Sequence, residues 1–238
     1  MPNGNTVKHG WILLCMCTPL YNETLRGCFT VGKRKKFIVN CKCIAFILTE
    51  LDIPGMKPVS VRQQIKKLTD DGRLKRFDTG IYYIPQKTIF RSGSTLSVDD
   101  VIRKKYLQDG VNRCGYVGGI LFANQLGLTT QVPALYEIYT NKATTEYRET
   151  KLANLRVIIR KPYCEIDTEN VATLQFLDLI KEVVDISEVD GEELTNRLIG
   201  YMKKKNIKFE NLKPFLPYYP ERIYKNMYEV GLLNGVSA

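Results

Sequence analysis

The chain has 238 residues, of which 44% are hydrophobic and 25% charged, so it is long enough for one large or two ordinary domains and has a globular composition. Its formal charge is +10, and the excess is uneven: residues 1–90 hold 15 Lys and Arg against 6 Asp and Glu, whereas residues 91–238 hold 20 against 19. The leading third is therefore expected to meet a polyanion. The apolar run from Trp11 to Cys17 is too short for a membrane span or a signal peptide, so neither class is expected.

The cysteines and the single histidine exclude several kinds of site. Seven cysteines, an odd number, form no regular framework, and a chain of this length needs no disulfides, which indicates a reducing cytoplasm. Zinc ligands are usually separated by two to four residues, whereas the pairs here are separated by one, so we interpret the thiols as free and buried. His9 alone cannot build histidine-based catalysis, and we predict no catalytic residue, metal or cofactor. The clustered cysteines are Cys15, Cys17, Cys28, Cys41 and Cys43.

Residues 1–35 match no recognisable element and are treated as an N-terminal extension of unknown role. The basic cluster at residues 33–36 leads into apolar residues that recur at spacings of three and four from Phe37 to Leu51, which predicts an amphipathic helix. Pro54 and Gly55 would end the segment. The cluster is equally compatible with phosphate contact and with solvation. The helix is expected to support a second helix that follows it.

That second helix is predicted from Ser60 to Asp71. Its apolar residues Val61, Ile65 and Leu68 recur at spacings of four and three and so share one face, which leaves polar and basic residues on the other. Ser60, with a glutamine three residues later, fits a capping box, and Gly72 suits the left-handed position just past the last turn. The helix can therefore be packed and basic at once.

A hairpin is predicted directly after this helix. Residues 73–77 and 81–84 are strand-like, and Asp78, Thr79 and Gly80 form the turn between them. A helix followed at once by a basic hairpin is typical of a winged helix-turn-helix, predicted over residues 36–88, in which the helix enters the major groove and the wing meets the DNA backbone. The alternative is a solvated helix beside an ordinary hairpin. The predicted DNA contacts are Ser60, Arg62, Gln63, Lys66 and Lys67 on the helix, and Arg73, Lys75, Arg76 and Tyr82 on the hairpin.

Residues 86–97 are polar enough to be a linker, and a second domain is expected to begin within them, near residue 92. Ser97 would cap a helix that runs through Tyr106 and ends before Gly110. Further along we predict a tight glycine turn into a short apolar helix, a pair of strands, and helices to the end of the chain. The predicted fold class is thus α+β: the winged helix-turn-helix, a mixed α/β domain over residues 92–185 and a helical C-terminal region over 186–238. These later elements are the turn Gly118-Gly119 with a helix ending at Gly127, strands Tyr136–Thr140 and Leu155–Arg160, and helices beginning near Val171, Glu192 and Pro217.

Two enzyme-like motifs are weak. The pair Gly118-Gly119 lacks the Gly-Lys-Ser/Thr ending of a phosphate loop and the third glycine of a dinucleotide fingerprint. Glu149-Thr150-Lys151 fits the E-x-K part of a metal-dependent nuclease site, for which Asp109 is the nearest upstream acidic partner. The alternative for Glu149 is an exposed ion pair. We therefore do not predict an enzyme.

Five segments in succession carry a family resemblance: DTGIYYIP, VDDVIRKKYL, CGYVGGILFANQLGLTTQVP, YEIYTNKAT and LRVIIRKP. Together they resemble the AbiEi-type antitoxins of bacterial abortive-infection, or type IV toxin-antitoxin, systems. The resemblance covers roughly residues 40–185 and is most specific from Gly115 to Pro133. Residues 1–35 and the last 50 residues lie outside it.

The resemblance implies a phage-defence function. It implies a cytoplasmic protein that binds repeats in double-stranded operator DNA, represses its own operon, and counteracts a nucleotidyltransferase-like toxin of the AbiEii class without a stable complex. Binding as a dimer is compatible with such repeats, and no membrane is involved. Local hydrogen bonding to the backbone is the alternative for the candidate antitoxin residues. A ligand-sensing winged-helix transcription regulator without a toxin partner is the alternative function. The candidate antitoxin residues are Asn124, Thr129, Thr130 and Gln131.

Overall fold

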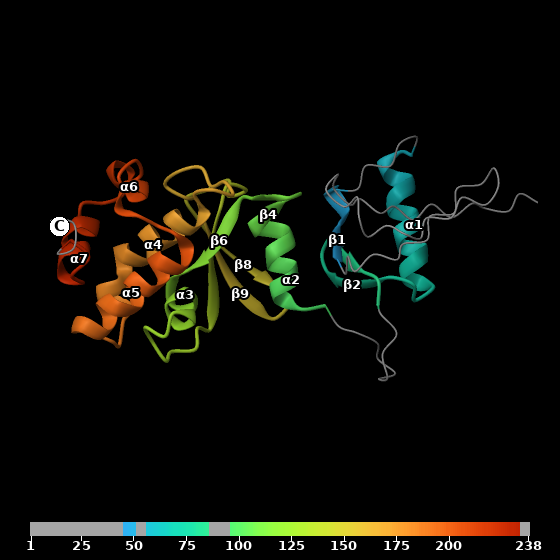
Figure 1. Cartoon of the computed structure of the whole chain (residues 1–238). Coiled ribbons are helices and arrows are strands. Elements are labelled where there is room, and N and C mark those ends of the chain that lie inside the picture. The colour runs from blue at the N-terminus through green and yellow to red at the C-terminus, as the bar shows by residue number, and fades with distance from the viewer. Residues whose placement is uncertain (1–44, 51–55, 86–95, 234–238) are drawn as a thin grey trace, which may run out of the picture. The chain divides into compact units, whose positions relative to one another are not determined.

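The computed structural model describes residues 45–50, 56–85 and 96–233 (Figure 1). It is a mixed α+β structure with small sheets. The chain divides into two compact units, residues 1–100 (unit 1) and 101–238 (unit 2), and each is described by itself. Within the described ranges, every helix is too short or too polar to cross a bilayer.

Unit 1 is a small antiparallel sheet with one long helix. The sheet order is β1-β3-β2, so the strand before the helix joins the second strand of the hairpin that follows it. The apolar face of α1, formed by Val61, Ile65 and Leu68, packs with Leu74 in one buried cluster. This is the face that the spacing predicted. The elements are β1 (Ala45–Ile47), the 3₁₀ turn η1 (Leu48–Glu50), α1 (Pro58–Asp70), β2 (Lys75–Asp78) and β3 (Ile81–Tyr83).

The predicted capping box of α1 is wrong. The helix begins at Pro58, with Lys57 at the N-cap and no side-chain capping bond, so Ser60 lies inside the first turn. Proline at the first helical position needs no N–H partner and already has a helical φ, which starts the helix two residues before the predicted cap. Gln63 is therefore free of a capping role and lies on the exposed face.

Helix α1 ends, as predicted, with Gly72 in the left-handed conformation just past its last turn. Gly72 has φ +68°, and its N–H donates to the Thr69 carbonyl at 3.0 Å. The Arg73 N–H donates to the Leu68 carbonyl at 2.9 Å, so this pair of bonds is the Schellman arrangement. The glycine thus lets the chain reverse directly from the helix into β2.

The helix predicted over residues 37–51 is wrong where the structure describes it. Residues 45–47 form β1, which pairs antiparallel with β3, and residues 48–50 form the turn η1. An apolar segment this short is compatible with either state, and the ladder to β3 decides in favour of the strand because it satisfies the backbone polar groups of both. The rest of that prediction, the basic cluster, the N-terminal extension and the five clustered cysteines lie outside the described residues.

The hairpin prediction is confirmed. Asp78 pairs with Ile81 across a two-residue turn in which Gly80 has φ +74°, and the Thr79 N–H donates to Asp78 Oδ1 at 2.6 Å. The register shifts between Arg76 and Asp78, which marks a bulge in β2. The turn chemistry that the sequence indicated is therefore the one that the structure uses.

Unit 2 is entered through a helix capped as predicted. The Asp99 N–H donates to the Ser97 hydroxyl at 3.2 Å, so Ser97 caps α2 (Val98–Ile102). This helix continues as a π-helical turn, η2 (Arg103–Leu107). A small hairpin follows, formed by β4 (Gln108–Asp109) and β5 (Asn112–Arg113). The division between the two units falls within α2, later than the boundary predicted near residue 92.

A four-stranded sheet of order β6-β7-β9-β8 forms the centre of unit 2. The two predicted strands, β7 (Leu135–Thr140) and β9 (Leu155–Arg160), pair in parallel. Between them in sequence lies β8 (Tyr147–Leu152), an edge strand that no apolar pattern indicates because its side chains are mostly polar and exposed. The fourth strand, β6 (Gly115–Gly118), runs directly into α3 (Gly119–Gln125) through the predicted glycine turn.

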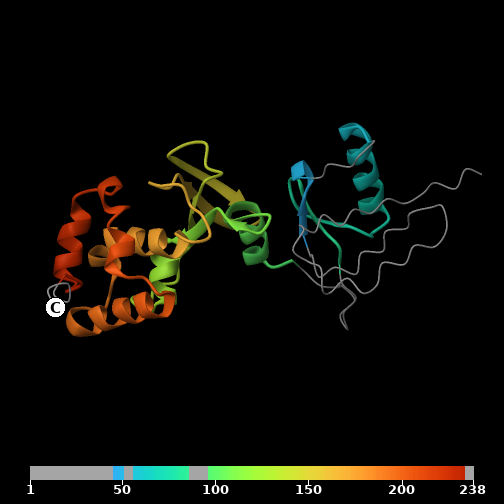
Figure 2. The ribbon, with the colours of Figure 1, turned by 45° about the horizontal axis from the view of Figure 1, so that its top comes forward.

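The C-terminal helices complete the same core. They gather beside the sheet in both views (Figures 1 and 2), and one cluster of buried side chains runs from Tyr116 to Val230. Side chains from residues 186–233 therefore share one core with residues of the sheet. The helices are α4 (Val171–Ile186), α5 (Gly191–Lys205), α6 (Phe209–Leu212), the 3₁₀ turn η3 (Leu216–Tyr218) and α7 (Arg222–Glu229).

A buried polar network joins α4 to the sheet. The Tyr116 hydroxyl donates to Asp178, and Lys181 Nζ lies 3.3 Å from Asp178 Oδ1 and 3.2 Å from the Tyr139 hydroxyl. Burial raises the pKa of the Asp178 carboxyl to about 6, against the opposing effect of the Lys181 charge. Because a buried charge is costly without partners, this network favours one register of α4 on the sheet.

Candidate nucleic-acid interface

The face of α1 opposite its core residues is exposed and basic. Arg62, Gln63, Lys66 and Lys67 are all exposed, while Ser60 is half-buried. Arg62 and Lys66 are four residues apart and so are neighbours on the helix surface. The structure thus places four of the five predicted helix contacts where a nucleic acid can reach them.

Two of these cations make no polar contact with the described part of the chain. Among the residues that the structure describes, neither Arg62 nor Lys66 has a hydrogen-bond or ion-pair partner. Asp70 and the C-cap residue Asp71 are exposed carboxylates at the C-terminal end of the helix, four residues beyond Lys66 and Lys67. A polyanion approaching α1 therefore meets more positive than negative charge, with the repulsion confined to the C-terminal turn.

The predicted DNA contacts on the hairpin differ in how far they are exposed to a nucleic acid. Arg73 and Arg76 are exposed and Lys75 is half-buried. The Arg76 guanidinium donates to the Asp78 carbonyl and to Thr79 Oγ1, both at 3.2 Å, which holds it against the turn. A guanidinium has five N–H donors, so others stay available for phosphate. Tyr82 is half-buried and packs against the core cluster of α1, so its ring serves the fold more than a surface contact.

The other predicted site, residues 124–131, is held together by hydrogen bonds of its own. Asn124 Nδ2 donates to the carbonyls of Thr129 and Gln131, both at 3.2 Å, and the Gln131 N–H donates to Thr129 Oγ1 at 3.1 Å. Thr129 is buried, whereas Thr130 and Gln131 are exposed. These contacts are the local hydrogen bonds to the backbone that were the alternative to a direct antitoxin role for these residues.

Glu188, which accepts several hydrogen bonds from this segment, was not among the residues predicted from the sequence. Its carboxylate accepts from Thr129 Oγ1 at 2.9 Å and from the Thr130 N–H and hydroxyl at 2.7 and 2.8 Å. Its own N–H donates to the Leu128 carbonyl at 2.8 Å. Since the partners of its carboxylate lie 58 and 59 residues away, no local pattern could have indicated it. The threonines thereby tie the segment after α3 to the exit of α4.

The Glu188 contacts make this segment sensitive to acid. Bonds from the Thr130 backbone and hydroxyl and from Thr129 lower the pKa of the Glu188 carboxyl to about 2. A lowered folded-state pKa stabilises the segment above the usual carboxyl range, and the stabilisation is lost as the pH falls toward 2. We expect Glu188→Gln to speed hydrogen exchange of the Thr130 amide about threefold or more at neutral pH, since a charge-assisted bond is weakened.

Native-state hydrogen exchange by NMR measures this effect. Glu192→Gln removes an exposed carboxylate from the first turn of α5 and is the matched control, which should leave the Thr130 amide unchanged. Equal exchange rates in the wild type and Glu188→Gln would show that Glu188 does not hold the segment.

The nuclease-like motif lies in an ordinary surface setting. Glu149 on β8 pairs with Arg156 on β9 at 2.7 Å, and this contact is the main cause of the lowered pKa of its carboxyl. Asp109 lies in β4, which pairs with β5 and not with the strand of Glu149. In the described part of the chain, no three His, Cys, Asp or Glu side chains group as metal ligands do, and Cys114 and Cys164 are free thiols.

Comparison with known proteins adds no assignment: no family model, curated protein or solved structure matches this chain.

Proposed function

We propose that this protein is the antitoxin and autorepressor of a type IV toxin-antitoxin system, acting in the bacterial cytoplasm on a nucleotidyltransferase-like toxin. The observation that carries the DNA-binding part is the exposed basic face of α1, followed at once by the hairpin of β2 and β3. The antitoxin part rests on the sequence resemblance described above.

The topology of unit 1 supports a winged helix-turn-helix. Helix α1 and the hairpin share one core, β1 pairs with β3, and the order β1-β3-β2 leaves β2 at the edge of the sheet. In a domain of this kind the helix enters the major groove and the hairpin follows the neighbouring backbone. Arg62, Gln63, Lys66 and Lys67 then meet base edges and phosphates, and Arg73, Lys75 and Arg76 meet phosphates.

Unit 2 is proposed to counteract the toxin without a stable complex, and without enzymatic activity, metal or cofactor. The resemblance is most specific over residues 115–133, and these residues run from β6 through α3 into the segment bound by Glu188. The polar surface of that segment is formed by Thr130 and Gln131, which are exposed. A dimer on repeated operator half-sites fits this proposal.

Co-expression separates the two activities. The full-length protein should restore growth to cells that express the neighbouring nucleotidyltransferase-like toxin, and it should repress a reporter that carries its own upstream DNA. A full-length variant with Lys66→Glu and Lys67→Glu should lose repression and retain rescue. Failure of the wild type to rescue would refute the antitoxin assignment, and unchanged repression by the variant would refute the α1 interface.

One observation favours the alternative, a ligand-sensing winged-helix regulator without a toxin partner. Unit 2 contains a pocket of about 410 Å³ that is lined in part by Arg197, Lys204 and Lys205. A regulator of this class would change its affinity for DNA when the pocket is filled. Such a change, together with the lack of a neighbouring toxin gene, would favour the alternative.

A further inference from the structure

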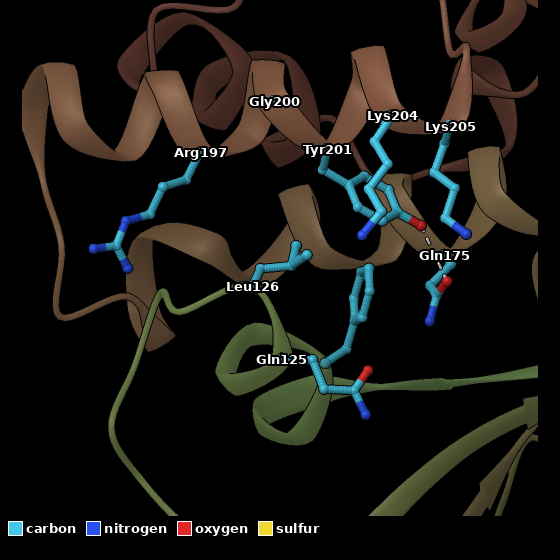
Figure 3. Close-up of a pocket in the computed structure, with 9 residues that line it drawn as sticks. Gln125, Leu126, Gln175, Arg197, Gly200, Tyr201, Lys204 and Lys205 are labelled. Carbon is cyan, nitrogen blue, oxygen red and sulfur yellow. Dashed lines mark hydrogen bonds between the residues drawn. The ribbon is translucent and has the colours of Figure 1, made fainter.

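A pocket opens between α3, α4 and α5 of unit 2 (Figure 3). Its volume of about 410 Å³ falls within the range of small-molecule sites, roughly 300–1,000 Å³. Helix α5 supplies one wall, and α3 and α4 supply the remainder. The lining residues are Phe122, Gln125, Leu126, Gln175, Arg197, Gly200, Tyr201, Lys204 and Lys205.

The wall from α5 is a single helical face that carries three cations. Its lining residues recur at spacings of three and four, so they lie above one another on the helix. Within the described ranges, Lys204 and Lys205 have no ion-pair or hydrogen-bond partner, and both extend from α5 toward α3 and α4 in Figure 3. Arg197 is held in place by bonds to the Gly127 carbonyl and Glu193. The charge of the lysines is therefore open to an incoming ligand.

The floor of the pocket is formed by packed aromatic rings and a hydrogen-bonded glutamine. The rings of Phe122 and Tyr201 meet edge to face with centroids 5.4 Å apart, and both residues are buried. Gln175 Nε2 donates to the Val117 carbonyl at 2.8 Å, and its Oε1 accepts from the Tyr201 hydroxyl at 3.2 Å. Gln125, at the rim, is exposed. The site thus joins an ordered base that contains two aromatic rings to a charged wall.

Gly200 keeps the wall open. A Cβ placed at this residue meets nothing within 4 Å, so the absence of a side chain contributes free space to the pocket without any demand from backbone geometry. Glycine inside a helix costs about 1 kcal/mol relative to alanine. No close neighbour requires glycine at this residue, so a need for open space in the pocket is a reason for its presence.

From these features we infer that the pocket binds a small phosphorylated ligand with a flat apolar part, of the nucleoside phosphate class. The phosphates lie against Lys204 and Lys205, and the apolar part lies over Leu126 and the ring edges of the floor. Cations in the last turn of a helix also interact favourably with its dipole, which explains why lysines occur at this end of α5. The dipole would favour a lysine at any of residues 203–205, so it does not explain why Lys204 and Lys205 line the pocket. The inference does not depend on DNA binding by unit 1.

Binding of ADP to the full chain, measured by isothermal titration calorimetry at physiological salt, tests the charged wall. Lys204→Ala with Lys205→Ala should weaken ADP binding by about tenfold or more, as expected when charge-assisted hydrogen bonds are lost. The matched control, Lys203→Ala with Lys208→Ala, removes the same charge from exposed residues that do not line the pocket and should leave affinity within about twofold. Equal losses in both variants would overturn the inference.

Gly200→Leu tests the cavity without changing charge. Leucine is a better helix former than glycine and the residue is exposed, so the variant should fold, while its side chain fills the mouth of the pocket and abolishes ADP binding. Undiminished binding in Gly200→Leu, or no binding of ADP by the wild type, would overturn the inference. Lysine-dependent binding of a single-stranded oligonucleotide in place of ADP would also overturn it, because the site would then be a nucleic-acid surface.

Discussion

Replacing Lys66 and Lys67 by glutamate is expected to weaken binding to the duplex upstream of the gene by about 30-fold or more at physiological salt. Both residues are exposed on α1, on the face away from its core. Each phosphate contact contributes about 0.9 to the slope of log K against log salt, so two lost contacts remove about 1.8 from the slope. Counterion release alone then accounts for the 30-fold change, and reversal of charge adds repulsion.

Fluorescence anisotropy at several salt concentrations measures both the affinity and the slope. The control, Lys203→Glu with Lys208→Glu, produces the same change of net charge on exposed residues of unit 2 and should leave the slope unchanged. Asp70→Asn removes the carboxylate in the last turn of α1 and should strengthen binding. An unchanged isotherm for the Lys66 and Lys67 variant, or equal losses in the control, would contradict the proposed interface.

Gly115→Ala is expected to destabilise unit 2 by about 3 kcal/mol or more, which lowers the Tm by about 10 °C. A Cβ at this residue would lie 2.5 Å from the Tyr106 carbonyl oxygen and 2.7 Å from that of Tyr139. Both oxygens belong to the backbone, so no side-chain rotation can relieve the contact. The Tyr106 carbonyl also accepts from Thr140 Oγ1 at 2.6 Å, and displacement of that carbonyl would weaken this buried bond.

Replacement of Gly200 by alanine should raise the thermal stability instead of lowering it. Gly200 lies within α5, where a Cβ meets nothing within 4 Å, and alanine favours the helix by about 0.5–1 kcal/mol. Thermal unfolding followed by circular dichroism should therefore show a small rise in Tm for Gly200→Ala and a large fall for Gly115→Ala. Similar Tm values for the two variants would show that the strand has room to move away from Tyr106.

Short-range patterns predicted the elements whose ends depend on neighbouring residues. The apolar face of α1, the glycine at residue 72, the hairpin turn at Gly80 and the cap at Ser97 all agree with the structure. Each depends on contacts within a few residues, so the sequence contains the whole interaction. The capping box at Ser60 failed because Pro58, equally local, begins the helix earlier.

The uneven distribution of charge and the basic face of α1 also follow from the sequence. In an amphipathic helix, the residues that are not on the apolar face form the exposed face. The structure then decides which predicted residues are accessible. It leaves Arg62 and Lys66 exposed, and it packs Tyr82 against the core of unit 1.

The sequence by itself determined the amphipathic helix, the hairpin and the positive charge of the leading third. Tertiary structure alone decided that residues 45–47 pair with β3, that β7 and β9 are parallel neighbours, and that β8 lies at the sheet edge. It also joined Thr130 to Glu188 across 58 residues and Tyr116 to Asp178 across 62. Such contacts form only when the chain folds back on itself, and their free energy overrides local propensities too small to compete.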